Sequence, residues 1–246
     1  AYPYIAIPGH PIAMFYGHIF DGVYQYTDFD KVGESYILKD GVPNNGNARE
    51  KIQPGDIKFK DINRDGVVND YDLTIIGNPN PKHIGGFGNN FQYKNFDLNV
   101  FFQWSYGGDV LNANRIEFEG GDPNARTSLN MFASFANRWT PENQTNELYR
   151  IGGQGPAVYS SRTIEDGSFL KLKTVSLSYS FPKLNWKHIG GLRLYVTGQN
   201  LLTWTKYRGY DPEVSYRGAS TLEAGEDFGG YPQARTFMFG IQLDIK

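Results

Sequence analysis

Residues 61–72 carry oxygen-bearing side chains at the spacing of a calcium-binding loop. Acidic or amide side chains occupy the first, third and fifth positions, Gly66 at the sixth allows a sharp turn, and further oxygen donors follow at the seventh, ninth and twelfth. The predicted ligands are Asp61, Asn63, Asp65, the Val67 carbonyl, Asn69 and Asp72. Because hard cations prefer oxygen ligands, this spacing predicts a structural site for Ca²⁺ or a similar divalent ion.

A metal-free turn is the alternative interpretation of this loop. Its last position is Asp72, whereas a longer Glu usually reaches back to bind the ion through both carboxylate oxygens. Asn, Asp and Gly are also the commonest residues of solvated turns. Both interpretations therefore stay open at the level of sequence.

Outside this loop, the residues that could act in catalysis do not form a known catalytic motif, so the sequence does not predict an enzyme. Neither HExxH nor GxSxG occurs, and the Gly-rich stretch at 152–155 lacks the strand-to-helix setting of a phosphate loop. Acidic residues at 223, 226 and 227 stand in a Gly-rich loop, where we expect solvated carboxylates rather than the desolvated acid of a glycosidase. The four histidines are scattered: His10, His18, His83 and His188.

Composition narrows the class of protein. The 24 basic and 26 acidic residues give a formal net charge of −2, which provides no basic surface for nucleic acid. The absence of cysteine excludes disulfides and thiolate chemistry. Aromatic residues make up 15% of the chain, and no apolar stretch approaches the ~20 residues of a membrane-spanning helix. If the chain enters a membrane, we expect it to do so with the strands of a β-barrel.

Period-two alternation is the main structural signal. Apolar residues alternate with polar or small ones across 96–104, 175–181, 192–197 and 237–245. The polar sides carry Ser, Thr, Gln and Asn, which suit a water-filled lumen, and the apolar sides end in aromatic residues. The pattern predicts an all-β, antiparallel transmembrane β-barrel segment.

Short and long connections between the predicted strands alternate along the chain. Lys94-Asn95 and residues 182–190 are short, whereas 109–167 and 205–234 are long. Because transmembrane barrels have short periplasmic turns and long extracellular loops, we expect 27–82, 109–167 and 205–234 outside the cell and the C-terminus in the periplasm. We also expect a first strand within 12–26, and a short helix over 128–139 from its apolar spacing.

Several phrases of the sequence occur together in the order found in one known family. They are PGDIKFKD at 54–61 before the calcium-type loop, IGNPNPK at 76–82, YKNFDL at 93–98, RWTPEN at 138–143, DGSFLKLK at 166–173, GQNLLTWTKY at 198–207, GYDPE at 209–213 and Tyr231-Pro232. Together they resemble the SusC/RagA class of TonB-dependent outer-membrane transporters. The resemblance covers nearly the whole chain from about Pro11 and corresponds to the C-terminal part of such a transporter.

This resemblance implies a barrel of about 22 strands with an N-terminal plug. The chain, residues 1–246, is expected to supply about six of those strands and no plug domain or TonB box. The implied partners are the remaining strands of the same barrel, outer-membrane lipid, TonB acting through the plug, and a surface lipoprotein of the SusD class. The implied activity is energised import of glycans or peptides.

Aromatic residues are the candidate contacts for such a cargo. For each of them the alternative is packing in a loop or in the aromatic girdle at the membrane interface. The candidates are Trp104, Tyr106, Trp139, Tyr159 and Trp204. The alternative function for the whole chain is a soluble, calcium-stabilised β-sandwich that binds carbohydrate, for which short connections at both ends and a second packed sheet are expected.

Overall fold

The computed structural model describes residues 3–120, 130–156, 159–182, 187–216, 218 and 220–245. The chain divides into two compact units, each assembled from three separated segments. Unit 1 comprises Ala1–Asn80, Asp109–Glu165 and Ser215–Gly229, and unit 2 comprises Pro81–Gly108, Asp166–Val214 and Gly230–Lys246. Each unit is described by itself below.

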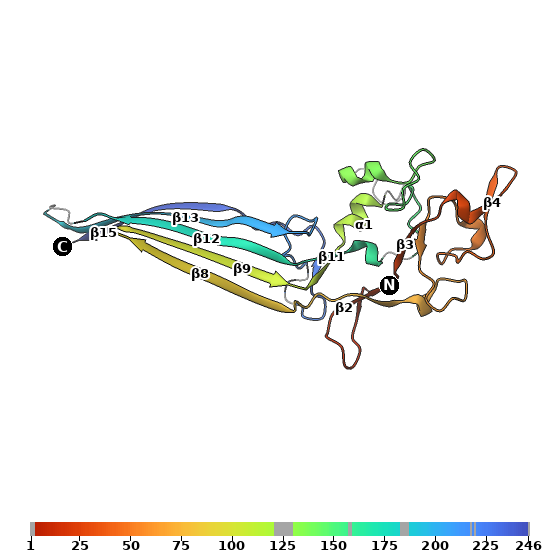
Figure 1. The fold of residues 1–246 in the computed structure, drawn as a ribbon, viewed down its shortest axis with the longest axis horizontal. Helices are drawn as coiled ribbons and strands as arrows, with labels where there is room; N and C mark the ends of the chain where they lie inside the picture. The colour runs from red at the N-terminus through yellow and green to blue at the C-terminus, as the bar shows by residue number, and fades with distance from the viewer. Residues whose placement is uncertain are drawn as a thin grey trace. The chain divides into compact units, whose positions relative to one another are not determined.

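Unit 2 is a five-stranded antiparallel sheet of long strands, which lie side by side in Figure 1. Their order is β15-β13-β12-β9-β8, and every neighbouring pair is antiparallel. The strands are β8 (His83–Tyr93), β9 (Phe96–Tyr106), β12 (Phe169–Ser180), β13 (Ile189–Thr205) and β15 (Thr236–Ile245). The alternating segments of the sequence thus form strands as predicted, since β-branched and aromatic side chains favour a pleated backbone.

Two local features shape this sheet. The turn between β8 and β9 has Lys94 at φ 55°, as tight hairpin turns require. The β12–β13 register shifts between Leu172 and Thr174, and Asn200, on the opposite strand, has φ 52°. This irregularity is a β-bulge, which locally redirects the side chains of β13.

Unit 1 contains short strands in small sheets. β1 (Tyr4–Ile5), β2 (Met14–Gly17) and β7 (Thr74–Gly77) form one, and β11 (Ile164–Asp166), β10 (Asp109–Asn112) and β14 (Glu226–Asp227) form another. Two pairs complete the unit: β3 (Phe20–Val23) with β6 (Ile57–Phe59), and β4 (Phe29–Val32) with β5 (Ser35–Leu38).

The first barrel strand expected within 12–26 is wrong as a member of the long sheet. That segment holds β2 and β3, which pair with β7 and β6 and not with the five-stranded sheet. Its burial does not alternate, because Phe15, Val23 and Tyr24 are all buried. A side chain at Gly17 would meet the Tyr159 carbonyl oxygen at 2.7 Å, so the segment follows the packing of unit 1. The described residues therefore give five strands to the long sheet, not six.

The helix expected over 128–139 is also wrong in type and extent. Residues 128 and 129 lie outside the described residues, and the rest holds only the 3₁₀ helix η4 (Ala133–Asn137). Phe132 is extended, its amide donates to the Phe118 carbonyl at 3.0 Å, and the two rings pack at 5.2 Å. This contact ties the segment to α1 (Asn114–Glu119), the sole α-helix of the described ranges.

The remaining 3₁₀ helices are single turns, namely η1 (Tyr26–Asp28), η2 (Arg49–Lys51), η3 (Asp70–Asp72) and η5 (Ser161–Thr163). No helix in the part of the chain that the structure describes is long and apolar enough to cross a membrane.

Two clusters of buried side chains hold unit 1 together. One gathers Val23, Ile57, Phe59, Val68, Trp139, Leu148 and Tyr149, and the other gathers Tyr24, Phe29, Leu38 and Ile52. Gly55, at φ 93°, lies so close to the Trp139 ring that a side chain there would collide with it. The core therefore joins segments that are far apart in the sequence.

Candidate functional site

The sheet of unit 2 has one apolar and one polar face. Residues that stand opposite one another across neighbouring strands share a face. The register sets Leu98 opposite Phe91 and Leu177, and sets Val196 opposite Leu177 and Phe239. The apolar side chains stay uncovered, with Phe239 at 82% and Ile245 at 83% of their full exposure.

Aromatic residues lie at both ends of the apolar face. At one end Trp104, Leu170 and Trp204 form a row across three strands. At the other end Phe96 packs on Tyr179 with ring centroids 4.6 Å apart. Trp104 and Phe96 lie eight positions apart along β9, or roughly 26 Å at ~3.3 Å per residue. This span is comparable with the ~25 Å apolar band of a transmembrane strand.

The position of three predicted cargo contacts favours the girdle alternative. Trp104, Tyr106 and Trp204 lie on the apolar face, where the Trp104 indole donates to His83 Nδ1 at 3.1 Å. The His83 and Tyr106 rings stack at 5.1 Å. Amphipathic rings of this kind suit a boundary between an apolar layer and water.

The two other predicted cargo contacts lie in unit 1. Trp139 is 5% exposed and donates its indole N–H to Gln25 Oε1 at 3.0 Å, so little of its surface is left for a ligand. Tyr159 is half-buried, and its carbonyl oxygen accepts the His18 amide at 3.3 Å. Cargo contact by any of the five residues stays a prediction.

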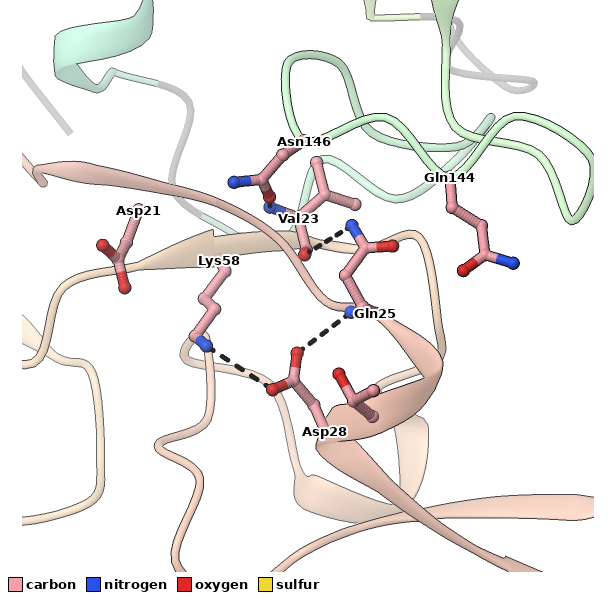
Figure 2. A pocket seen from close by; sticks show the side chains of 8 residues that line it. Asp21, Val23, Gln25, Asp28, Lys58, Gln144 and Asn146 are labelled. Carbon is pink, nitrogen blue, oxygen red and sulfur yellow. Dashed lines mark hydrogen bonds and ion pairs between the residues drawn. The ribbon is translucent and has the colours of Figure 1, made fainter.

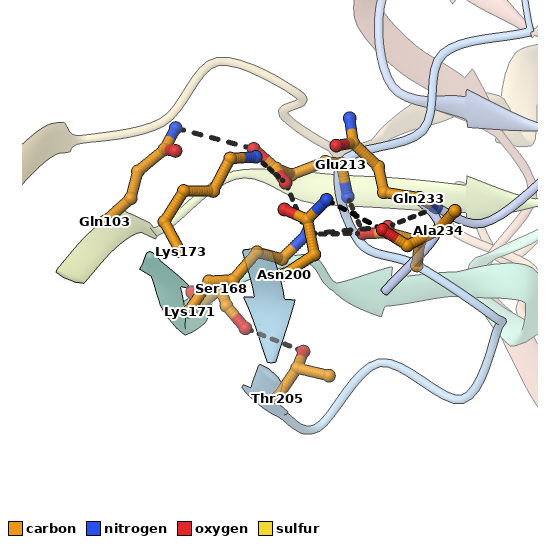
Figure 3. Close-up of polar contacts among 10 residues, drawn as sticks. Gln103, Ser168, Lys171, Lys173, Asn200, Thr205, Glu213, Gln233 and Ala234 are labelled. Atoms are coloured by element: carbon orange, nitrogen blue, oxygen red, sulfur yellow. Dashed lines mark hydrogen bonds and ion pairs between the residues drawn. The ribbon is translucent and has the colours of Figure 1, made fainter. Parts of the chain in front are cut away.

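A buried ion-pair cluster stands on the polar face of the sheet (Figure 3). Lys171 is 1% exposed, and its ammonium lies 3.2 Å from Asp211 Oδ1 and also bonds Glu213. Lys173 contacts the same Glu213 carboxylate at 3.3 Å, and Gln103 donates to it at 3.4 Å. The cluster fastens the segment after β13 to the wall formed by β9 and β12.

Sequence reasoning missed this cluster, although its signal was present. Lysines two residues apart on one strand share a face, and Asp211-Pro212-Glu213 offers two carboxylates at a turn. Burial alone would raise the pKa of the Asp211 carboxyl, but amide hydrogen bonds from Glu213 and Gln233, together with Lys171, hold that pKa below its usual value. Asp211 is therefore an ionised anchor.

The calcium-type loop is closed by hydrogen bonds from its own backbone. The Asp61 carboxylate accepts the amides of Arg64 at 2.6 Å and Gly66 at 2.7 Å, and Gly66 has φ 84°, in keeping with the sharp turn predicted there. Asp72 is fully buried and accepts the amides of Ile62 at 2.7 Å and Asn69 at 2.9 Å. The loop is thus a series of turns pinned at both ends.

The donor set of this loop fits a hard cation in its chemistry. Asn63 and Asp65 each accept one backbone amide, at 2.9 Å and 2.8 Å, and a carboxylate oxygen retains a further lone pair for a metal. Within the described ranges, however, no three His, Asp or Glu side chains gather closely enough to hold a metal ion. The calcium site stays a prediction.

Unit 1 also has a polar cavity of about 570 Å³, shown in Figure 2. Its lining is mostly engaged in organising the backbone: Asn146 accepts the Val23 amide at 2.7 Å, and Asp28 accepts the Gln25 amide at 2.9 Å. Lys58 lies 3.7 Å from Asp28. The cavity is consequently a polar hollow lined by β3, β6, η1 and the segment at 144–146.

A second buried charge cluster joins α1 to the segment before β11. Glu119 accepts from Arg115 at 2.9 Å and from Arg162 at 2.8 Å, and Arg115 also contacts Glu165 at 3.1 Å. Burial would raise the pKa of the Glu119 carboxyl, but the two guanidinium groups and the Ser134 hydroxyl hold it below its usual value. These pairs order the loops of unit 1.

Comparison with known proteins shows which family the chain belongs to. No protein-family model matches it. It is 37% identical over 241 residues to "TonB-dependent receptor P3" of Formosa agariphila, covering 96% of this chain and 22% of that receptor. It is 32% identical over 201 residues to "TonB-dependent receptor SusC" of Bacteroides thetaiotaomicron, covering 80% of this chain and 18% of that receptor.

Solved structures agree on the fold. The chain matches the RagAB peptide importer in its "closed-closed" state with a TM-score of 0.68 and 24% identity, over 99% of this chain and 25% of that one. The chain therefore shares the fold of a segment of that structure, and its own described elements are mostly strands. The chain belongs to the TonB-dependent receptors of the SusC/RagA type, whose members are receptors and transporters rather than enzymes. It spans about a fifth of the length of the curated relatives cited above.

Proposed function

We propose that the chain forms part of the wall and the extracellular loops of an outer-membrane importer energised by TonB. The observation that carries this proposal is the two-faced sheet of unit 2. Its apolar face exposes Phe237, Phe239 and Ile241 at 60%, 82% and 69%. Exposed apolar surface costs about 25 cal/mol per Å² in water, so a continuous face of this kind needs a lipid environment.

The polar face and the free edges support the same role. Within the described residues, unit 2 holds a single sheet, in which β8 and β15 each have one neighbour. Unpaired edges are costly in lipid, so the remaining strands of a closed barrel are the partners we propose for them. Gln103 and Ser176 on the other face then line a water-filled lumen.

Topology supports a direction across the membrane. The β8–β9 turn and the connection from β12 to β13 are short, and both lie at the same end of the sheet as the end of β15. At the other end the strands continue into segments of unit 1. Because extracellular loops are the long ones in such proteins, we propose that unit 1 faces outward and that β15 ends in the periplasm.

The proposed cargo is a glycan or a peptide, captured together with a surface lipoprotein of the SusD class. Peptide import is named for the RagAB structure, and the SusC relative belongs to the same type of receptor. TonB would act through the plug of the whole transporter. We further propose that residues 61–72 bind Ca²⁺ as a structural staple of the outward loops.

Single-cysteine labelling tests the direction, because residues 1–246 contain no cysteine that would react as well. We expect Tyr71→Cys, at a position 84% exposed in unit 1, to react with an impermeant maleimide on intact cells. The matched variant Lys94→Cys in the β8–β9 turn should react only after the outer membrane is opened. Equal labelling of both on intact cells, or a parent protein that stays soluble without detergent, would refute the proposal.

The calcium proposal is tested by metal content. Asp65→Ala removes one proposed ligand from an exposed position, so the purified protein should lose about one Ca²⁺ while the long sheet keeps its strand signal. Asp40→Ala, which removes an exposed carboxylate elsewhere in unit 1, is the control. Unchanged calcium content in the Asp65 variant would overturn the assignment.

A further inference from the structure

A second cavity of about 370 Å³ lies on the polar face of the long sheet, wholly within unit 2. Its floor is formed by residues of β12 and β13, and its walls by the segments around 210 and 232–235. Figure 3 shows Lys171, Asn200 and Gln233 converging at this place. The side chains that could meet a ligand are Lys171, Asn200, Thr203, Tyr210, Gln233 and Arg235.

One cationic side chain beside the cavity has no acidic partner among the residues that the structure describes. Lys171 and Lys173 are matched by Asp211 and Glu213 in the buried cluster. Arg235 is exposed, lines the cavity, and forms no ion pair with any residue that the structure describes. A guanidinium in this position offers the paired N–H donors that bind a carboxylate through both oxygens.

A hydrogen-bond acceptor without a partner sets a second requirement on the ligand. Asn200 Oδ1 is buried without a hydrogen-bond partner, while its Nδ2 donates to the Ala234 carbonyl at 3.0 Å. That donor bond fixes which way the amide points. A buried acceptor without a partner is costly, so it favours a ligand that brings an O–H or N–H donor.

Tyr210 supplies the remaining part of the site. Its ring lines the cavity, is 75% exposed, and forms no hydrogen bond with the described part of the chain. An aromatic face beside a cation suits a small ligand with both an apolar and a polar side. The volume is at the lower end for ligand cavities, which limits the bound portion to about one sugar ring or two amino-acid residues.

We propose that this cavity binds a carboxylate-bearing unit, with the carboxylate on Arg235 and a hydroxyl or N–H donor of the same unit on Asn200 Oδ1. The inference rests on the proposed import function and assigns a chemical class to part of its cargo. An acidic sugar and an acidic peptide share this chemistry. The Lys171 cluster holds the wall of the cavity in place by fastening Asp211 to the sheet.

Isothermal titration of the full-length parent transporter in detergent tests the proposal. The probes are methyl glucuronide against methyl glucoside, and N-acetyl-aspartate amide against N-acetyl-asparagine amide. We expect the acidic member of at least one pair to bind at least ten-fold more tightly than its neutral partner. The pair that shows this preference identifies whether the carboxylate belongs to a sugar or to a peptide. Arg235→Gln should abolish this preference, and Arg235→Lys should retain part of it.

The control is Arg64→Gln, which removes the same charge from an exposed position in unit 1 and should leave the preference intact. A second variant, Thr203→Glu, places a carboxylate on the cavity floor and should also abolish the preference, which keeps the test valid if Arg235→Gln does not fold. Equal binding within both pairs, no binding of either acid at 10 mM, or a preference that survives in the Arg235→Gln and Thr203→Glu variants would overturn the proposal. Failure of the import function would appear separately, as a parent protein that needs no detergent.

Discussion

The two units of this chain bury opposite kinds of side chain. Among the buried hydrophobic residues of the described part, Tyr207 alone lies in unit 2, and the others build unit 1. Unit 2 instead buries Lys171, Ser178 and Asp211 and exposes most of its phenylalanines and isoleucines. Unit 1 is therefore organised as a water-surrounded protein is, whereas unit 2 is organised for lipid on one face and water on the other.

The largest contrast should come from removing a core aromatic side chain of unit 1. Phe59 is 1% exposed, so Phe59→Ala leaves a cavity and should cost about 3–5 kcal/mol of the stability of that unit. Hydrogen exchange should show faster exchange in β3 and β6 and unchanged protection in the long strands. Phe239→Ala, at a position 82% exposed, is the control and should cost far less in detergent. Equal losses would remove the distinction between the units.

A charge in the middle of the apolar face should give the next largest effect. Val100 lies midway between Trp104 and Phe96 on β9, so Val100→Lys should cost ~2–4 kcal/mol in lipid vesicles. The neighbouring Asn99 points to the polar face, and Asn99→Lys should change the free energy of unfolding little. Denaturant unfolding in vesicles measures both. A larger loss for Asn99→Lys would reverse the assignment of the two faces.

Removing the buried cation of unit 2 should cost somewhat less. Lys171→Met leaves the carboxylates of Asp211 and Glu213 unmatched, which costs ~3–5 kcal/mol for a fully buried pair. Because Glu213 is partly solvated, we expect about 2–3 kcal/mol, seen as faster exchange of the amides at 207–216. Lys173→Met, which breaks a more exposed pair, should cost below about 1 kcal/mol. Equal effects of the two variants would mean that Lys171 is not the anchor.

The sequence predicted the long sheet well, because alternation over six to nine residues is a strong local signal. It predicted the inner structure of unit 1 poorly. β2 and β3 depend on contacts with β7 and β6, whose paired residues lie 34 to 62 positions away along the chain, and such packing overrides local periodicity. The same reason explains the missed anchor, since Lys171 and Asp211 are forty positions apart and only the fold brings them together.

The smallest expected effect is the change in stability with pH that comes from two carboxylates, one in each unit. Burial raises the pKa of Asp56 in unit 1, even though the Gln53 amide and Arg150 oppose the shift, whereas the pKa of Asp211 in unit 2 is lowered. Asp211 therefore stabilises unit 2 fully above its ordinary pKa of ~3.9, and this contribution is lost as the pH falls through its lower native value. Asp56 has the opposite sign, because unit 1 gains stability when this carboxyl takes up a proton near its raised pKa.

Hydrogen exchange between pH 6 and pH 3 resolves the two responses by segment. We expect Asp211→Asn to flatten the acid-induced loss of protection around 207–216, and Asp56→Asn to remove a gain around β6. Each variant is the control for the other unit, because the two carboxylates lie in separate cores. If both variants changed the acid response in the same direction, the two units would share one electrostatic design, and the contrast between them would be confined to their apolar side chains.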